Sequence, residues 1–265
     1  MITFSPTGNT RRAEQALCTG LKLKIDREVE TFDITYPEGR EKDINLNEDD
    51  ILIIGFPVYA SRLPNKIVGY LKDAIKGKRT PAIGMVTYGN RSYGDGLSEL
   101  FCHLKNNGIL PIAGISVPGE HSFSEKLATG RPNQEDLEAL REFGKRCGQK
   151  ILKEKYTEPY IKGNFPPGPY YKPKKEDGSP ANILKVKPVT DRKKCTKCGI
   201  CSEVCPMGSI DKNNFRNVVG ICIKCMACIK YCPEGAKQFI DRDFLSHVKM
   251  VEKNFTYRKE IETFL

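Results

Sequence analysis

Eight of the eleven cysteines in this chain occupy two copies of one spacing. In each copy the cysteines are separated by two, two and three residues, and a proline follows the last of them. Cysteines placed so regularly are typical ligands of a metal centre, so this repeat constrains the chemistry before any argument about the fold. The first copy is Cys195, Cys198, Cys201 and Cys205 before Pro206, and the second is Cys222, Cys225, Cys228 and Cys232 before Pro233.

The spacing suits a cubane [4Fe–4S] cluster, which needs four thiolates arranged around a cube. Three cysteines at i, i+3 and i+6 wrap one face, and the fourth thiolate must come from the opposite side. In two-cluster proteins the other run supplies it. The small residues Gly199 and Ala227 suit a close approach of the backbone to inorganic sulfur. We therefore assign Cys195, Cys198, Cys201 and Cys232 to one cluster, and Cys222, Cys225, Cys228 and Cys205 to the other.

Zinc is the main alternative for paired Cys-x2-Cys motifs on a basic segment. A zinc site uses four ligands per ion and usually leaves a longer gap between its pairs, so it does not explain the third cysteine of each run. A disulfide framework fits less well, because the cysteines are clustered and we expect no leader segment. The repeat therefore predicts one-electron transfer through iron–sulfur clusters.

The length of 265 residues predicts one or two domains. A two-cluster domain needs only the segment 187–241, so the residues before it must form a domain with its own core. No apolar run in the sequence is long enough to cross a membrane, and we expect a cytoplasmic protein with no membrane insertion. Exposed clusters of low potential are sensitive to oxygen, which favours an anaerobic or micro-oxic host.

The formal net charge of +10 overstates the charge of the working protein, because each oxidised cluster with its thiolates carries about −2. Basic residues outnumber acidic ones between Lys162 and Lys194. This segment is either a solvated linker that offsets the cluster charge or a docking patch for an acidic redox partner. No nucleic-acid-binding motif accompanies the charge, so we expect redox protein partners and no nucleic acid. Formation of a homodimer stays open.

The first 156 residues alternate short apolar strands with amphipathic helices, the pattern of a doubly wound α/β sheet. The run at 51–56 is continuously apolar, as expected of a strand buried on both faces. We expect five strands in one parallel sheet. The predicted strands are 2–4, 28–34, 51–56, 82–87 and 109–117, and the predicted helices are 9–24, 63–75, 94–106 and 133–156.

Three loops that follow the first, third and fourth predicted strands are unusual in sequence. In such a sheet, ligands bind beyond the carboxyl ends of the strands, near the point where the strand order reverses. The first loop, SPTGNT at 5–10, runs directly into a helix, where hydroxyls and amides can surround a phosphate. The other two are GFPVYA at 55–60 and TYGNRSYGD at 87–95.

These loops resemble the FMN-binding loops of the flavodoxin family. The resemblance implies that the first loop holds the phosphate and that Tyr59 and Tyr93 flank the isoalloxazine ring, where stacking stabilises a flavin beyond the area it buries. The residues that match are Ser5, Thr7, Gly8, Asn9 and Thr10 for the phosphate, and Pro57, Val58, Tyr59, Ala60, Thr87, Tyr88, Gly89, Asn90, Tyr93, Gly94 and Asp95 for the ring.

The whole chain resembles the flavodoxin–ferredoxin fusions known as EFR1-type ferredoxins, and the segment 119–136 adds to that resemblance. It departs from flavodoxins in its short first strand, its lack of tryptophan and its basic charge. The resemblance implies a flavodoxin-like FMN-binding domain with a doubly wound, five-stranded parallel sheet at 1–156, a Pro- and Lys-rich linker at 157–186, a small α+β bacterial-type 2[4Fe–4S] ferredoxin domain at 187–241 and a helical tail at 242–265.

Several other residues carry weaker signals. Cys18, Cys102 and Cys147 lie on predicted helices and are expected to be small buried side chains. His121, in the loop before the last helix of the first domain, either relays protons to a flavin or only packs in its loop. Arg131 either shapes the same loop or is a surface charge.

The sequence thus predicts an electron-transfer iron–sulfur flavoprotein that passes electrons between two [4Fe–4S] clusters and FMN, with no catalytic side chain assigned. The alternative is an FMN-dependent oxidoreductase that reduces an organic substrate or nicotinamide, with the clusters as its electron supply. No GxGxxG motif follows a strand, so a second dinucleotide fold is not indicated. A third hypothesis is a zinc-dependent regulatory protein with a vestigial flavin fold, which would be colourless.

Overall fold

A six-stranded sheet, built mainly from the first half of the chain, forms the larger part of the computed structural model, which describes residues 1–154 and 156–265. The strand order is β10-β7-β6-β4-β1-β2, and all neighbouring strands are parallel except β10 and β7. The strands are β1 (Ile2–Thr3), β2 (Phe32–Asp33), β4 (Leu52–Pro57), β6 (Thr80–Tyr88), β7 (Ile109–Pro118) and β10 (Glu262–Phe264).

The order of the parallel strands identifies the architecture. Counted along the chain they lie as 2-1-3-4-5, which is the flavodoxin-like order. The direction of winding reverses between β1 and β4, so the carboxyl ends of these two strands border the crevice where ligands bind in such sheets. The first and second unusual loops of the sequence both begin there.

The sheet contains one strand more than the five expected from the sequence. The predicted helical tail is helical only over α7 (Arg242–Asn254), and the chain then returns to the sheet edge as β10, antiparallel to β7. Ile261 packs with the core on one face of the sheet and Phe264 with the core on the other. This alternation belongs to a strand, and it was hidden in the sequence by the charged residues around it.

Two helices cover each face of the sheet. On one face, α1 (Asn9–Lys22) packs closely against α4 (Gln134–Leu152), and a Cβ at Gly20 or Gly144 would overlap the backbone of the facing helix. The other face carries α2 (Val68–Ala74) and α3 (Gly96–Asn106). Neighbouring residues of β4 reach opposite cores, with Ile53 in one and Ile54 in the other, as its continuous apolar sequence predicts.

The element bounds differ from the sequence predictions mainly at short or exposed segments. The predicted helix 63–75 begins only at Val68, because Pro64 starts a turn before it. A small parallel pair, β3 (Ile44–Leu46) with β5 (Ile75–Gly77), and the 3-10 turn η1 (Pro37–Arg40) were not predicted. The predicted helix 133–156 ends at Leu152, and position 155 lies outside the described residues.

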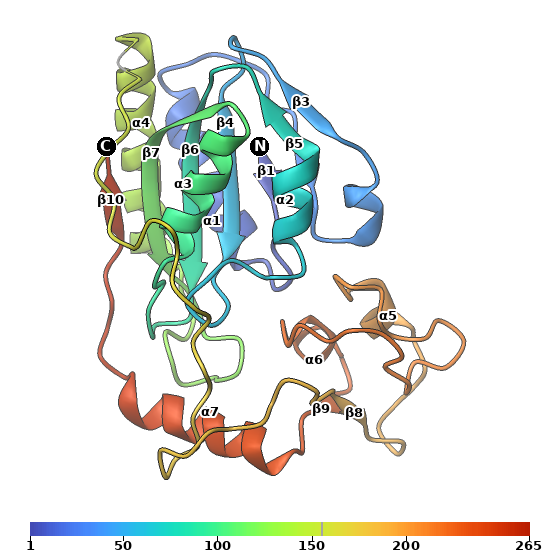
Figure 1. Cartoon of the computed structure of the whole chain (residues 1–265). Helices are drawn as coiled ribbons and strands as arrows, with labels where there is room; N and C mark the ends of the chain where they lie inside the picture. The colour runs from blue at the N-terminus through green and yellow to red at the C-terminus, as the bar shows by residue number, and fades with distance from the viewer. Residues whose placement is uncertain (155) are drawn as a thin grey trace.

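The cysteine runs form a small unit at the carboxyl-end edge of the sheet (Figure 1). Each run contains one short helix, α5 (Ile200–Glu203) or α6 (Ala227–Lys230). The strands β8 (Val189–Thr190) and β9 (Lys237–Gln238) pair antiparallel. A small core that includes Phe239 and Phe244 joins this unit to α7.

The segment between the two halves lies along the sheet domain. The Tyr170 hydroxyl donates to the Leu63 carbonyl oxygen over 2.9 Å, and the Tyr171 amide donates to the Ala60 carbonyl oxygen over 2.8 Å. The Arg91 guanidinium lies 4.0 Å above the Tyr171 ring. These contacts fix the path of the linker beside the loop after β4. Of the helices described, none has the length and apolar character needed to cross a membrane.

Candidate redox site

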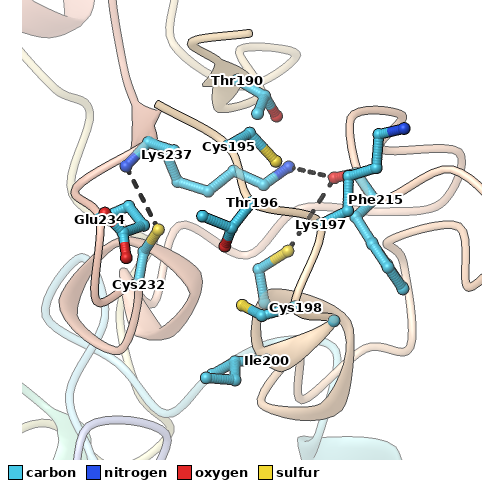
Figure 2. Close-up of a pocket in the computed structure, with 13 residues that line it drawn as sticks. Thr190, Cys195, Thr196, Lys197, Cys198, Ile200, Phe215, Cys232, Glu234 and Lys237 are labelled. Atoms are coloured by element: carbon cyan, nitrogen blue, oxygen red, sulfur yellow. Dashed lines mark hydrogen bonds between the residues drawn. The ribbon is translucent and has the colours of Figure 1, made fainter. Parts of the chain in front are cut away.

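The eight cysteines of the repeat line two separate cavities. One cavity is lined by the outer set and the other by the inner set. The last cysteine of each run lines the cavity formed by the other run, which is the grouping assigned from the sequence. Binding of a cluster by either set stays a prediction. The outer set (Figure 2) is Cys195, Cys198, Cys201 and Cys232, and the inner set is Cys205, Cys222, Cys225 and Cys228.

The two runs fold into the same backbone shape. Lys197 and Gly199 flank the second cysteine of the first run with φ of 61° and 86°, and Lys224 and Met226 flank that of the second with 57° and 69°. Alternation of this kind turns successive amides toward one side, a geometry that recurs at iron–sulfur sites. The residue equivalent to Gly199 in the second run is Met226, which adopts the left-handed conformation without being glycine.

The similarity continues after the last cysteine of each run. Gly208 and Gly235 both have φ of 56°, which favours glycine. The next amide in each run donates to the cysteine sulfur, from Ser209 to Cys205 Sγ over 3.4 Å and from Ala236 to Cys232 Sγ over 3.2 Å. Hydrogen bonds of this kind stabilise negative charge on sulfur.

The cavities suit a cluster better than a single metal ion. Zinc–sulfur bonds of about 2.3 Å hold the thiolates of a zinc site about 3.8 Å apart. Among the described residues, no three His, Cys, Asp or Glu side chains form a group that could hold one metal ion. The thiols instead line the walls of a cavity, as a cubane requires.

The inner cavity is largely apolar. Its lining includes Met207, Ile210, Ile223 and Phe239. Burial raises the pKa of the Cys228 thiol to about 12, which reflects the scarcity of water around this set. The lining of the outer cavity contains more polar side chains, among them Thr190, Glu234 and Lys237, and Cys198 is exposed.

The inner set lies against the sheet domain. Met207 and Ile223 pack on the core beneath β1 and β4, and the Arg40 side chain donates to the Pro206 carbonyl oxygen over 2.6 Å. Burial raises the pKa of the Tyr59 hydroxyl well above its usual value, and the nearby Cys225 and Cys222 thiols add to the effect. The loop after β4 therefore borders the inner set directly.

The loop at 5–10 keeps the features of a phosphate site. Gly8 has φ of 87°, and α1 begins at the next residue with no acidic side chain in its first turn and no side-chain cap. A helix end whose N-cap residue supplies no capping side chain, and whose first turn has no carboxylate, attracts an anion. A Cβ at Gly8 would lie 3.5 Å from the Tyr231 hydroxyl, so the cysteine unit approaches this loop. These features fit the phosphate group of FMN.

The residues of the first loop divide into two kinds. Ser5 and Thr10 are buried and support the loop: the Ser5 hydroxyl accepts from the Arg11 amide over 3.0 Å, and the Thr10 hydroxyl bonds that of Thr87 over 2.6 Å. Thr7, Gly8 and Asn9 are partly exposed and remain available to a ligand.

The second loop is held in a tight turn. Ala60 and Ser61 both have positive φ, of 51° and 69°, and the Tyr59 and Arg62 backbones exchange hydrogen bonds across them. The Val58 amide donates to the Thr87 carbonyl oxygen over 2.7 Å. Non-glycine residues rarely adopt such conformations, and they concentrate at functional sites. Pro57, Val58 and Tyr59 are left half-buried at the carboxyl end of β4.

The third loop is occupied by other parts of the chain. Tyr93 is buried in the core, where its hydroxyl donates to Glu262 Oε2 over 3.1 Å and its ring meets Tyr88 edge-on at 5.5 Å. A role of Tyr93 beside a flavin ring stays a prediction, and in this structure its side chain packs in the core of the sheet domain. The Asp95 carboxylate accepts from Asn164 and Gly168 of the linker rather than facing a ligand. The sequence could not foresee either partner, because both are distant along the chain.

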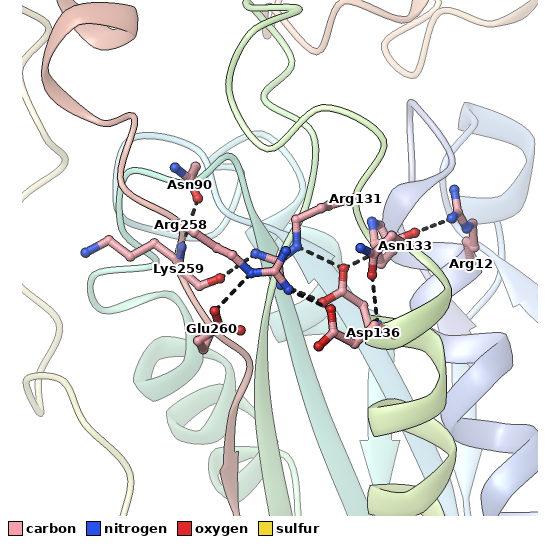
Figure 3. Close-up of polar contacts among 10 residues, drawn as sticks. Arg12, Asn90, Arg131, Asn133, Asp136, Arg258, Lys259 and Glu260 are labelled. Carbon is pink, nitrogen blue, oxygen red and sulfur yellow. Dashed lines mark hydrogen bonds and ion pairs between the residues drawn. The ribbon is translucent and has the colours of Figure 1, made fainter.

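The tail after α7 fastens the third loop (Figure 3). The Asn90 side-chain amide donates to the carbonyl oxygens of Phe255 and Tyr257 over 2.7 and 2.9 Å. Arg131 is buried, pairs with Asp136 and donates to the Lys259 carbonyl oxygen. Arg131 therefore shapes this region from within and is not a surface charge.

His121 packs against the third loop, because a Cβ at Gly89 would lie 2.5 Å from its ring. Burial lowers the pKa of His121 to about 4, and the His121 Nδ1 atom accepts from the Phe123 amide over 3.1 Å. A neutral imidazole with this fixed bond has one nitrogen left to exchange protons, and a relay role stays a prediction. Cys18 and Cys147 are buried as expected, whereas Cys102 is half-buried.

Two residues that border the site were missed from the sequence. Tyr231, between the last two cysteines of the second run, reaches the phosphate loop. Lys237 lines the outer cavity and is only 3 % exposed. Lys237 could have been noticed, because the equivalent position of the first run, five residues after the last cysteine, holds the apolar Ile210.

Comparisons with known proteins agree with the cysteine unit. Residues 190–237 match a family model described as a 4Fe-4S dicluster domain, so a domain that binds [4Fe–4S] clusters is present. No curated protein matches the chain. Among solved structures, the flavodoxin, WrbA-like protein from Agrobacterium tumefaciens is similar at 16% identity and a TM-score of 0.33, covering 59% of this chain and 96% of that one. The fold assignment above rests on the strand order.

Proposed function

We propose that this chain is an electron-transfer protein that passes electrons between two [4Fe–4S] clusters and FMN. The observation that carries the proposal is the position of the inner cysteine set, which borders the loops after β1 and β4. The approach of the Tyr231 hydroxyl to Gly8 and the nearness of Tyr59 to Cys225 support a short path between the two kinds of site.

The residues that would hold FMN are fewer than the resemblance implied. Thr7, Gly8 and Asn9 would bind the phosphate at the start of α1, and Tyr59 would lie against the ring. FMN accepts one or two electrons, so it would connect one-electron clusters with a two-electron partner. The chain would place the ring beside the inner set, because Tyr59 lies near Cys225 and Cys222. An EFR1-type fusion, a cytoplasmic location and an anaerobic host belong to the same proposal.

An acidic redox protein is the partner that the outer set would meet. Cys198 is exposed, and the basic residues Arg192, Lys193, Lys194 and Lys197 around it are exposed as well. Charge complementarity of this kind raises the rate of encounter and weakens with salt. Electrons would therefore enter or leave at the outer set, away from the flavin loops.

Anaerobic purification with iron, sulfide and flavin quantified tests the cofactor set. Two clusters and one flavin correspond to about eight irons and one FMN per chain. A colourless protein that holds two zinc ions would refute the proposal and support the regulatory alternative.

The docking surface can be tested separately with a reduced acidic flavodoxin as donor. Replacing Lys193 and Lys194 with Gln should slow cluster reduction and flatten its salt dependence, whereas replacing Lys172 and Lys174 of the linker with Gln should not. Equal effects of the two pairs would mean that the overall charge, and not a patch beside the outer set, guides the partner, and would contradict this docking surface.

A further inference from the structure

The two cysteine sets differ at one buried position that their shared geometry makes equivalent. Ile210 and Lys237 each follow the last cysteine of their run by five residues and come two residues after a glycine with φ of 56°. Each forms a short antiparallel pairing, Ile210 with Val218 and Lys237 with Thr190. Each is 3 % exposed. At this equivalent position the inner cavity has a buried isoleucine and the outer cavity has a buried lysine.

The Lys237 ammonium lacks a carboxylate partner among the described residues. Figure 2 shows its side chain extending toward Phe215, whose carbonyl oxygen accepts from Lys237 Nζ over 2.6 Å. An ammonium has three donors and its burial without a counter-charge is costly, so a lysine in such a place needs a negative neighbour. Burial raises the pKa of the Cys201 thiol, and Lys237 is the strongest of the charges that lower it.

The other charges near the cavities are better screened. Glu234 lines the outer cavity but is exposed. Lys224 lines the inner cavity, half-buried, and donates to the carbonyl oxygens of Leu184 and Cys222 over 2.8 and 3.3 Å. Water reaches both of these side chains, so their fields at the sulfurs are weaker than that of a buried ammonium.

We propose that the buried positive charge of Lys237 raises the reduction potential of the outer cluster. An oxidised cluster with four thiolates carries about −2 and gains one electron on reduction, so the reduced state is attracted more strongly by a fixed cation. The electron comes from the redox partner at the outer set, and no proton or bond changes. Lys237 thereby makes the outer cluster the easier of the two to reduce and lets it collect electrons at the surface. The inference rests on the proposed binding of a cluster by the outer set.

The test is an anaerobic potentiometric titration of the holoprotein, followed by electron paramagnetic resonance. Signals are assigned to the two sets with Cys195→Ser and Cys222→Ser, each of which perturbs one set. Lys237→Met should lower the ratio of reduced to oxidised outer cluster at a fixed potential about tenfold or more, which for a one-electron couple is about 59 mV. Lys237→Arg should restore most of that ratio.

Two comparisons keep the test decisive. Lys224→Met is the matched change at the inner cavity, and it should shift the potential of the outer cluster less than Lys237→Met does. The inference is overturned if Lys237→Met leaves the outer potential unchanged, or if both variants shift it equally. If Lys237→Met binds less iron, Ile210→Lys gives the reverse test and should raise the inner potential, and an unchanged value overturns the inference. Wild-type protein without clusters would instead refute the proposed function.

Discussion

The outer and inner cysteine sets share one ligand spacing and one backbone shape, yet their surroundings are opposite. Around the outer set, Cys198 is exposed and a buried ammonium from Lys237 lies beside the cavity. Around the inner set, Ile210 and Phe239 exclude water, and Tyr59 of the sheet domain lies near its thiols. The cysteine pattern therefore specifies which cofactor can bind, whereas the neighbouring residues decide what each copy does. A site with an exposed cysteine and basic neighbours suits exchange with another protein, and an apolar site beside the loops after β1 and β4 suits transfer within the chain.

Replacing the last cysteine of either run should have the largest effect, because it should remove one cluster and leave the other. Cys205→Ala should disrupt the inner cluster and leave the outer one, even though Cys205 belongs to the first run, because its sulfur lines the inner cavity. Cys232→Ala should do the reverse. Each variant should retain about half of the iron, measured together with the resonance spectrum of the remaining cluster. Loss of the cluster within the variant's own run would contradict the grouping assigned from the sequence.

A substitution at Gly8 should weaken FMN binding without affecting either cluster. Gly8→Ala forces alanine to adopt a φ of 87° at a strain of about 1–2 kcal/mol and places a methyl group between the phosphate loop and Tyr231. We expect the dissociation constant of FMN to rise about tenfold or more while iron content stays unchanged. Fluorescence titration of FMN checks this.

The matched control for that change is Gly178→Ala. Gly178 has φ of 85°, is exposed, and has nothing within 4 Å of an added Cβ. It should suffer the same backbone strain without any change in FMN affinity. If both variants bound FMN equally well, the loop at 5–10 would not be the phosphate site.

A smaller effect should appear in the stability of the sheet domain. Glu14 of α1 is fully buried against Gly55, and its Oε1 atom has no hydrogen-bond partner among the described residues. Burial raises the pKa of its carboxyl well above the usual value. A carboxyl with a raised pKa contributes its full stability below the pKa of the unfolded chain and loses it as pH rises toward the folded value.

Glu14→Gln should therefore unfold at a higher urea concentration than the wild type at pH about 8 and lose this advantage at pH about 5, by about 1.4 kcal/mol for each unit of pKa shift. The iron content and the two cluster potentials should not change, because Glu14 lies in the sheet domain. A stability difference of equal size at both pH values would mean that Glu14 remains ionised in the folded protein.

Features of this molecule that depend on local sequence patterns could be predicted, whereas features that depend on long-range contacts could not. The spacing of the cysteines and the apolar run of β4 depend on neighbours along the chain. The apolar run forms the expected buried strand, and the cysteines line two cavities, with cluster binding by them still a prediction. The burial of Tyr93 depends on a distant partner, because Glu262 lies beside it only where the tail returns to the sheet edge as β10. The strand β10 was missed for the same reason. A strand as short as β10 forms because it pairs with the edge of a sheet. Three residues are too few to show a periodic pattern that would predict this pairing.

The central claim is that the inner set connects the outer set with the flavin. It is tested most directly by photoreducing the holoprotein with a deazaflavin under anaerobic conditions and following the absorbance of clusters and flavin over time. In the wild type, flavin reduction should follow cluster reduction at a rate independent of protein concentration. In Cys205→Ala, the outer cluster should still be reduced, but flavin reduction should slow and become dependent on protein concentration. A rate in Cys205→Ala equal to that of the wild type would contradict the account.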